Sequence, residues 1–133
     1  MTRQPVLRQA VTLSEQVFGA QHPTTLTAKN NLALLHESQG NFNEAEPLYQ
    51  QVIAITSQVM GPRHADTVAV INNLAYLYLL KQEYDKALPL FEQVSTLWRE
   101  TLGDLHQRTL KASNNLARVH HKLGKLEQAE TLF

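Results

Sequence analysis

The sequence predicts an all-α fold in which pairs of helices stack one after another as an α-solenoid. A block of 42 residues recurs three times, and its copies begin at Gly19, Gly61 and Gly103. The tetrapeptide Asn-Asn-Leu-Ala follows each glycine at the same distance, ending at Ala33, Ala75 and Ala117, and Ala45, Ala87 and Ala129 keep the same period. A fixed period of 20–50 residues is typical of solenoids, in which each unit buries its apolar face against its neighbours.

Composition limits the function classes. The chain has 133 residues, of which 43% are hydrophobic and 18% charged, so it can bury a core. Twelve basic and twelve acidic residues balance, so we expect neither nucleic acid nor a membrane surface as partner. The longest apolar run, from Leu74 to Leu80, is far shorter than a membrane span. The absence of cysteine excludes a disulfide framework and fits a cytoplasmic location.

Each repeat is predicted to form two helices separated by a short turn. In the first copy, apolar residues at helical spacing are interrupted at Gly40-Asn41 and resume at Phe42, and Gly61 ends the second stretch. If His22 caps the first helix, Pro23 takes the first helical position, where its missing N–H is not needed. The same pattern along the chain predicts helices at 23–39, 43–59, 65–81, 85–101 and 107–123, an incoming helix near 5–18 and a further one from about 127.

The domain organisation is predicted to be a single repeat array over residues 1–133. The incoming helix aligns with the second helix of a repeat, because Pro5 and Leu7 stand 42 residues before Pro47 and Tyr49. Residues 1–18 are therefore a partial repeat, followed by 19–60, 61–102 and a truncated repeat at 103–133. We expect the chain to be a piece of a longer array.

The pattern resembles the tetratricopeptide repeat family, in its 42-residue variety found in kinesin light chains. The resemblance is carried by the Leu-Ala pairs, by the position occupied by His36, Tyr78 and His120, by the turn Gly40-Asn41-Phe42, and by the Gly-x-x-His connectors. Two departures are Gln82 in place of the turn glycine and Leu126 in place of the aromatic residue. The resemblance implies a right-handed superhelix, with the first helices on a concave surface, and a role as a protein–protein interaction scaffold.

Helix packing is predicted to rest on small and aromatic residues. Alanines let the two helices of a repeat approach closely, at Ala33 and Ala45, Ala75 and Ala87, and Ala117 and Ala129. Tyr49 and Phe91 fill the space between units. We expect His36 and His120 to face the core, as Tyr78 does. The second asparagine of each doublet, at Asn31, Asn73 and Asn115, is interpreted as a hydrogen-bonding contact to the neighbouring repeat.

The peptide-binding site is predicted on the face of the first helices that lies opposite the alanines. The groove would run from weakly acidic at Thr27 and Glu37, through apolar, to basic. In the kinesin light chains that this chain resembles, asparagines of this surface hold an extended peptide backbone, which implies the same role for the first asparagine of each doublet. The candidate residues are Asn30, Leu34, Asn72, Tyr76, Leu79, Lys111, Asn114 and Arg118.

No cofactor, metal site or catalytic group is predicted. His22, His64 and His106 are equivalent in successive repeats, and helix spacing of about 8–10 Å keeps them too far apart to share an ion. No nucleophile elbow, phosphate loop or zinc-protease motif is present. Two alternatives stay open: an assembly module whose exposed terminal helices form a homo-oligomer, and a regulatory array appended to a catalytic domain outside this chain.

Overall fold

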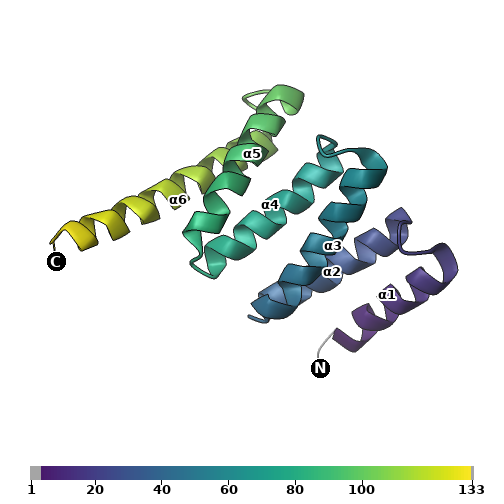
Figure 1. The fold of residues 1–133 in the computed structure, drawn as a ribbon. Coiled ribbons are helices and arrows are strands. Elements are labelled where there is room, and N and C mark those ends of the chain that lie inside the picture. Colours follow the sequence, from purple (N-terminus) through teal and green to yellow (C-terminus); the bar gives the residue numbers. More distant parts are fainter. Residues whose placement is uncertain (1–3, 133) are drawn as a thin grey trace. The chain divides into compact units, whose positions relative to one another are not determined.

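The computed structural model describes residues 4–132, with side chains described from Pro5 to Gly124. This part of the chain contains helices and no strand (Figure 1). The helices are α1 (Gln4–Phe18), α2 (Pro23–Ser38), α3 (Phe42–Met60), α4 (Ala65–Leu80), α5 (Tyr84–Leu102) and α6 (Gln107–Leu132). The predicted all-α repeat fold is confirmed, and the boundaries of the first five helices lie within one residue of the predicted ones.

The chain divides into two compact units, Met1–Val70 and Ile71–Phe133, with the boundary inside α4. In the first unit α2 packs against both α1 and α3. Between α1 and α2, the buried amine of Lys29 lies 3.6 Å from Glu15 Oε1. In the second unit α5 packs against α6, and the hydroxyls of Ser95 and Ser113 approach to 3.4 Å across that contact.

The three connectors before α2, α4 and α6 explain why glycine and histidine recur. Each histidine caps the following helix, because Nδ1 of His22, His64 and His106 accepts the backbone N–H two residues later at 3.1 Å. The connector glycines have φ between 91° and 101°, a conformation that favours glycine. The hydroxyls of Thr25 and Thr67 donate to the carbonyl oxygens of Gly19 and Gly61 at 2.7 and 2.8 Å. The connector is therefore a helix-capping motif, and its histidines are structural.

The core of each unit is built at equivalent positions of the repeat. Tyr49 in α3 and Phe91 in α5 are fully buried, as are the alanines at the predicted helix contacts, Ala33, Ala45, Ala75 and Ala87. Small side chains at these positions permit close packing of the helices, and a buried aromatic side chain contributes most of the apolar area.

The two helix-turn-helix hairpins have the same turn geometry although their sequences differ. Gly40 has φ of 79° and its counterpart Gln82 has φ of 63°. In each turn the residue that follows donates its N–H to a carbonyl near the end of the preceding helix, from Asn41 to His36 at 2.8 Å and from Glu83 to Tyr78 at 2.9 Å. Gln82 therefore carries a left-handed conformation that costs a non-glycine residue about 1–2 kcal/mol.

The predicted break at Gly124 is wrong, because α6 continues through it to Leu132. The following residues, Lys125-Leu126-Glu127-Gln128-Ala129, all favour helix, and a single glycine costs a helix only about 1 kcal/mol. No described helix folds back over α6, so the expected burial of His120 and Ala117 is also wrong and both are exposed. Val119, on the same helix, is fully buried. Ala129 lies outside the residues whose side chains are described.

Candidate functional site

The candidate residues of the first unit lie on α2. Leu34 is exposed and Asn30 is half-buried. Thr27, also on the predicted face, is exposed. Together these side chains provide a small, mostly uncharged surface.

Glu37, predicted to make this face acidic, is instead engaged with the interior of the hairpin. Its Oε1 accepts a hydrogen bond of 3.3 Å from the hydroxyl of the buried Tyr49. Burial raises the pKa of the Glu37 carboxyl above its ordinary value, and the Tyr49 hydrogen bond opposes that shift in part. Burial, with the neighbouring carboxylate, also raises the pKa of Tyr49, so the phenol stays protonated and remains a donor.

The candidate residues of the second unit begin on α4. Asn72 and Tyr76 are half-buried, whereas Leu79 is only 6% exposed and is not available at the surface. The side-chain oxygen of Asn72 is buried and has no hydrogen-bond partner among the residues that the structure describes. A buried polar atom without a partner costs free energy.

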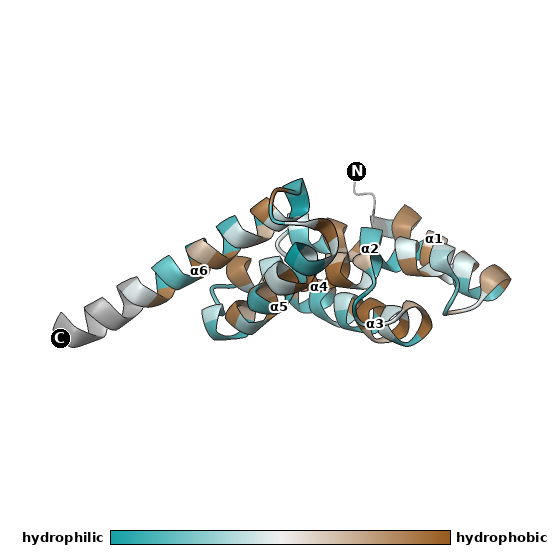
Figure 2. Cartoon of the chain, turned by 90° about the horizontal axis from the view of Figure 1, so that it is seen from above, coloured by the Kyte–Doolittle hydropathy of each residue, from teal (hydrophilic) through white to brown (hydrophobic). Residues whose placement is uncertain are grey.

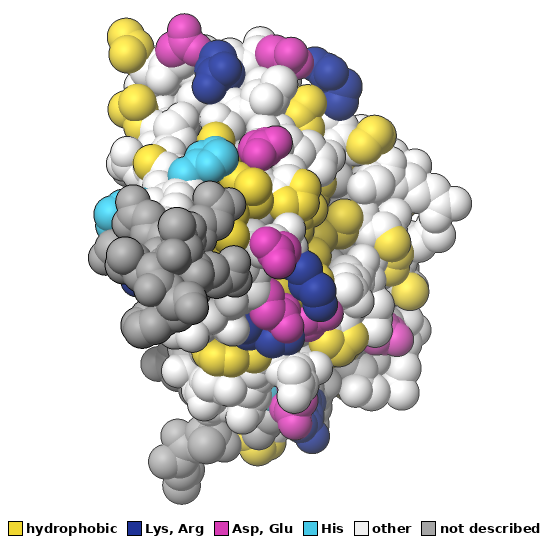
Figure 3. Space-filling view, turned by 60° about the vertical axis from the view of Figure 1, so that its left-hand side comes forward, with side chains coloured by type: hydrophobic (Ala, Val, Ile, Leu, Met, Phe, Trp, Pro, Cys, Tyr) yellow, Lys and Arg dark blue, Asp and Glu magenta, His cyan; other side chains and the backbone are white. Residues whose placement is uncertain are grey.

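The described part of α6 carries a basic stripe, which we define as Lys111, Arg118 and Lys122. All three are exposed. At 100° per residue they fall within about 40° of one another around the helix, and the exposed Asn114 lies beside them. No acidic residue occurs between Asp104 and Glu127, so this helix is locally basic although the whole chain is neutral. Figure 3 shows acidic and basic side chains intermixed on the face that it draws, with hydrophobic side chains between them.

None of the three basic side chains of this stripe forms an ion pair with a described residue. Arg118 Nη1 donates to Asn115 Oδ1 at 3.4 Å, within the same helix. As far as the described side chains go, the stripe therefore keeps its charge available for a partner.

The second asparagines of the doublets only partly match the structural interpretation. Asn31 is exposed, and Asn115 accepts a hydrogen bond of 3.4 Å from Arg118 of its own helix, so for these two residues no described contact supports the predicted bond to a neighbouring repeat. Asn73 is half-buried, and for it the interpretation stays a prediction.

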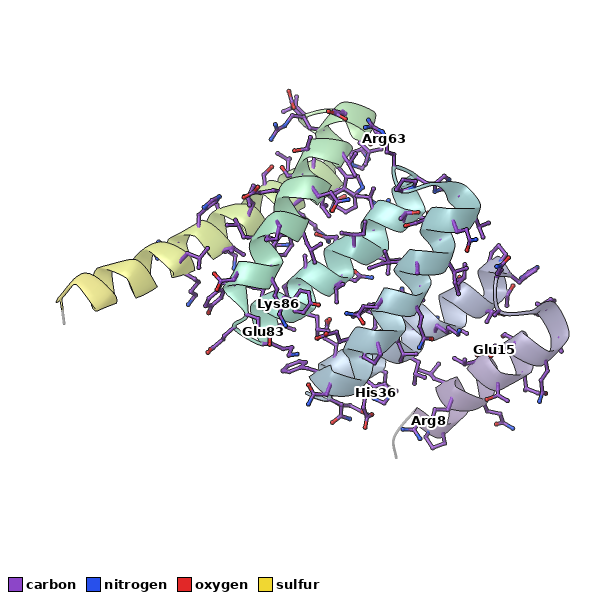
Figure 4. All side chains as sticks on the ribbon, in the orientation of Figure 1. Arg8, Glu15, His36, Arg63, Glu83 and Lys86 are labelled. Carbon is purple, nitrogen blue, oxygen red and sulfur yellow. The ribbon has the colours of Figure 1, made fainter. Side chains whose placement is uncertain are left out.

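Two charged clusters near the hairpin turns were not anticipated from the sequence. In the first unit, His36 Nδ1 lies 3.0 Å from Glu44 Oε2, and Arg8 Nη2 lies 4.0 Å from the same oxygen. In the second unit, the amine of Lys86 lies 5.6 Å from the centre of the Tyr78 ring and 3.8 Å from Glu83 Oε2. Figure 4 shows His36 and Arg8 on α2 and α1, and Glu83 next to Lys86 at the α4–α5 turn. Comparison of residues that stand 42 positions apart could have revealed them, because His36 and Glu44 of the first hairpin are both replaced in the second, by Tyr78 and Lys86.

Neither a metal-binding cluster nor a membrane span occurs among the described residues. No three His, Asp or Glu side chains gather where they could hold an ion. No helix in the described part combines the length and the apolar character needed to cross a bilayer.

Comparison with known proteins gives matches in both sequence and structure. The tetratricopeptide repeat family model matches residues 4–58, 25–96 and 66–133. A crystal structure of nearly identical TPR-like repeats from Podosopora anserina, described as those of a kinesin light chain, has a TM-score of 0.84 and 28% sequence identity, covering 95% of this chain and 60% of that chain. A crystal structure of a single-substitution variant of those repeats has the same TM-score and identity. No curated protein matches the sequence significantly.

A more distant structure agrees in fold alone. BtubC (BKLC) from P. vanneervenii has a TM-score of 0.81 at 23% identity, covering 96% of this chain and 51% of that chain. This chain therefore spans 60% or less of the length of these three solved structures. The recurring 42-residue hairpins, the family match over the chain and the structural neighbours agree: the chain belongs to the tetratricopeptide repeat family and has repeats like those of kinesin light chains.

Proposed function

We propose that this chain is a protein-binding module whose second unit binds an extended, acidic peptide segment of a partner protein. Repeats of this family generally mediate protein–protein interactions and typically act as non-enzymatic scaffolds. The finer assignment, to a peptide with an acidic residue beside an aromatic or large aliphatic anchor, rests on the side chains of α4 and α6.

The observation that carries the proposal is the unpaired basic stripe of α6. Lys111 and Arg118 are exposed and have no acidic partner among the described side chains. Opposite charge on a ligand both speeds its encounter and selects it over neutral sequences. Arg118 can hold a carboxylate with two parallel hydrogen bonds, a geometry that lysine lacks.

The apolar and amide groups of α4 support the remaining features of the ligand. Tyr76 is half-buried and offers ring surface to an aromatic or aliphatic anchor. The amide of the half-buried Asn72 and the exposed amide of Asn114 can each both donate and accept hydrogen bonds. An extended peptide presents such N–H and C=O groups along its whole length. The buried Leu79 is left out of the proposed surface.

The test is a titration of a synthetic peptide that carries an aromatic residue flanked by glutamates. We expect Arg118→Ala to weaken binding by about 1.5–3 kcal/mol, or roughly 10- to 150-fold, because a charge-assisted hydrogen bond is lost. The matched control is Arg8→Ala, which removes an exposed arginine of the first unit and is expected to leave the affinity unchanged. Equal affinity of wild type and Arg118→Ala, with both folded, would contradict the proposal.

The salt dependence of the same titration gives a second readout. Binding through the basic stripe should weaken as the salt concentration rises, because exposed charges are screened. An affinity that is independent of salt would place the binding energy outside the stripe.

A further inference from the structure

Two cations of the basic stripe stand one helical turn apart on α6. Arg118 and Lys122 are both exposed. Their i, i+4 spacing places them about 6 Å apart along the helix axis and about 40° apart around it. Figure 2 shows hydrophilic segments alternating with hydrophobic ones along α6. A single ligand group can therefore reach both side chains.

This pair of cations lacks an acidic neighbour. Neither Arg118 nor Lys122 forms an ion pair with a described residue. Elsewhere in the described part of the chain, basic side chains lie beside a carboxylate or over an aromatic ring, at Arg8, Lys29, Lys81, Lys86, Arg99 and Arg108. Like charges at i, i+4 repel and destabilise a helix. An anion bound between the two cations would remove that repulsion.

The face that carries the pair is open in every repeat. The α2 residues 84 positions before Arg118 and Lys122 are Leu34 and Ser38, and both are exposed although α1 and α3 pack on α2. Leu80 of α4, 42 positions before Lys122, is 39% exposed. The exposure of Arg118 and Lys122 therefore follows from their position in the repeat, since helices packed on both sides of α2 leave the same position uncovered.

The donors of the two side chains suit a group with several acceptor oxygens. Arg118 Nη1 donates to Asn115 Oδ1 at 3.4 Å, which engages one of the five N–H donors of the guanidinium group. The remaining donors form a planar fork that matches two oxygens of one anion. The ammonium group of Lys122 adds up to three donors.

From this arrangement we infer that the acidic residue of the ligand is a phosphorylated serine or threonine, with its phosphate held between Arg118 and Lys122. The inference rests on the proposed function and specifies the chemistry of its ligand. A phosphate monoester carries nearly two negative charges at neutral pH and three strong acceptor oxygens, whereas a carboxylate carries one charge. The phosphate therefore neutralises both cations, and phosphorylation of the partner controls binding.

A phosphopeptide fits this surface better than a lipid headgroup does. Recognition of anionic lipids by charge usually requires clusters of about four to eight basic residues, more than the basic stripe contains. The half-buried ring of Tyr76 on α4, in the same unit, offers apolar surface for a neighbouring side chain of a peptide.

Three synthetic peptides that differ at one residue test the inference. Each carries an aromatic residue, and the variable residue beside it is serine, glutamate or phosphoserine. We expect the phosphoserine peptide to bind the wild-type chain at least about tenfold more tightly than the glutamate peptide, because it gains a charge-assisted contact to the second cation. The serine peptide should bind most weakly.

Substitutions at Lys122 separate the phosphate from the general effect of charge. Lys122→Ala should abolish the preference for phosphoserine over glutamate, and Lys122→Arg should retain it. Arg118→Ala should weaken both acidic peptides. The matched control is Arg8→Ala, an exposed arginine of the first unit, which should leave all affinities unchanged. Circular dichroism of each variant establishes that the helices are retained.

Several outcomes would overturn the inference. Equal affinity for the phosphoserine and glutamate peptides would exclude phosphate recognition and leave the proposed function standing, whereas failure to bind either peptide would contradict both. A phosphoserine preference that survives Lys122→Ala would place the phosphate elsewhere. If inorganic phosphate competes as well as the phosphopeptide does, the site binds the ion alone. Binding to phosphatidylserine vesicles, without a phosphopeptide preference, would indicate a membrane surface instead.

Discussion

The α2–α3 hairpin of the first unit and the α4–α5 hairpin of the second reach the same turn geometry through different side chains. Where the first has His36 beside Glu44, the second has Tyr78 beneath Lys86, each residue standing 42 positions after its counterpart. An imidazole with a carboxylate is thus replaced by an aromatic ring with an ammonium group. Changing only one residue of the pair would place the aromatic ring next to a carboxylate, or the imidazole next to an ammonium group.

A second pair of positions differs in the same coupled way. Glu37 accepts a hydrogen bond from Tyr49 in the first hairpin, whereas the equivalent residues Leu79 and Phe91 are both apolar and buried. The two hairpins therefore show that the repeat constrains the two positions of a pair together. Both residues of a pair can be polar, or both can be apolar. A buried polar group without its partner is the costly state.

The largest expected effect comes from the aromatic position that both hairpins share. Phe91→Ala removes a fully buried ring and should cost about 3–5 kcal/mol of unfolding free energy, since the cavity cannot collapse completely. Tyr49→Ala should cost at least as much, because it also removes the donor to Glu37. Urea unfolding measures both. Leu105→Ala, at an exposed residue, should stay within about 0.5 kcal/mol of wild type. An equally small loss of stability in Phe91→Ala would contradict the equivalence of the two aromatic positions.

A smaller effect is expected from the coupled pair. Tyr49→Phe should destabilise by about 1.5 kcal/mol, because the Glu37 carboxylate loses its hydrogen bond while staying half-buried. Adding Glu37→Leu copies the pair of the second hairpin and should restore the stability. A double-mutant cycle gives the coupling energy directly. Additive losses from the two substitutions would show that these positions are independent.

The turn residues Gly40 and Gln82 give a further test of the equivalence of the two hairpins. Gln82→Gly should stabilise the second hairpin by about 0.5–1 kcal/mol, because relief of the left-handed conformation exceeds the added chain entropy of glycine. Gly40→Gln should destabilise the first hairpin by a similar amount. Thermal unfolding midpoints of the two variants would move in opposite directions. Midpoints moving the same way would mean that the turns are not equivalent.

The smallest effect is a pH dependence confined to the first hairpin. The pKa of Glu37 is raised from 4.5 by burial, so the folded chain holds this proton more tightly than the unfolded chain does. Its contribution to stability is fully present below that ordinary pKa and is lost as pH rises through the raised pKa. Stability measured across this range should fall more in wild type than in Glu37→Gln. If the stability of the two proteins changes with pH in the same way, Glu37 is not the source of the pH dependence.

The sequence alone predicts the helices and the buried positions well, because apolar spacing and the 42-residue period report on the same packing. It fails at α6, where the period implies a turn at Gly124 but local helix propensity carries the helix onward. It also misplaces Leu79 and Glu37 on an open face, because side chains on the edge of a helical face can turn inward when a partner such as Tyr49 is present. The charge pairs at the turns follow from contacts between helices, which periodicity does not show.

The candidate site is predictable to a different degree in each helix. The exposed positions of Lys111, Asn114 and Arg118 follow from helical spacing. The unpartnered oxygen of Asn72 does not, because it depends on which neighbouring groups reach the amide. The exposed charges of the basic stripe and the half-buried ring of Tyr76 together define the ligand chemistry we propose.

Affinity selection of a random peptide library on this chain tests the proposed function most directly, because it assumes no ligand. The account predicts convergence on a short motif with an aromatic or large aliphatic residue beside an acidic one, and loss of the selected peptides on Arg118→Glu. Convergence on basic motifs, or enrichment that Arg118→Glu leaves unchanged, would contradict it.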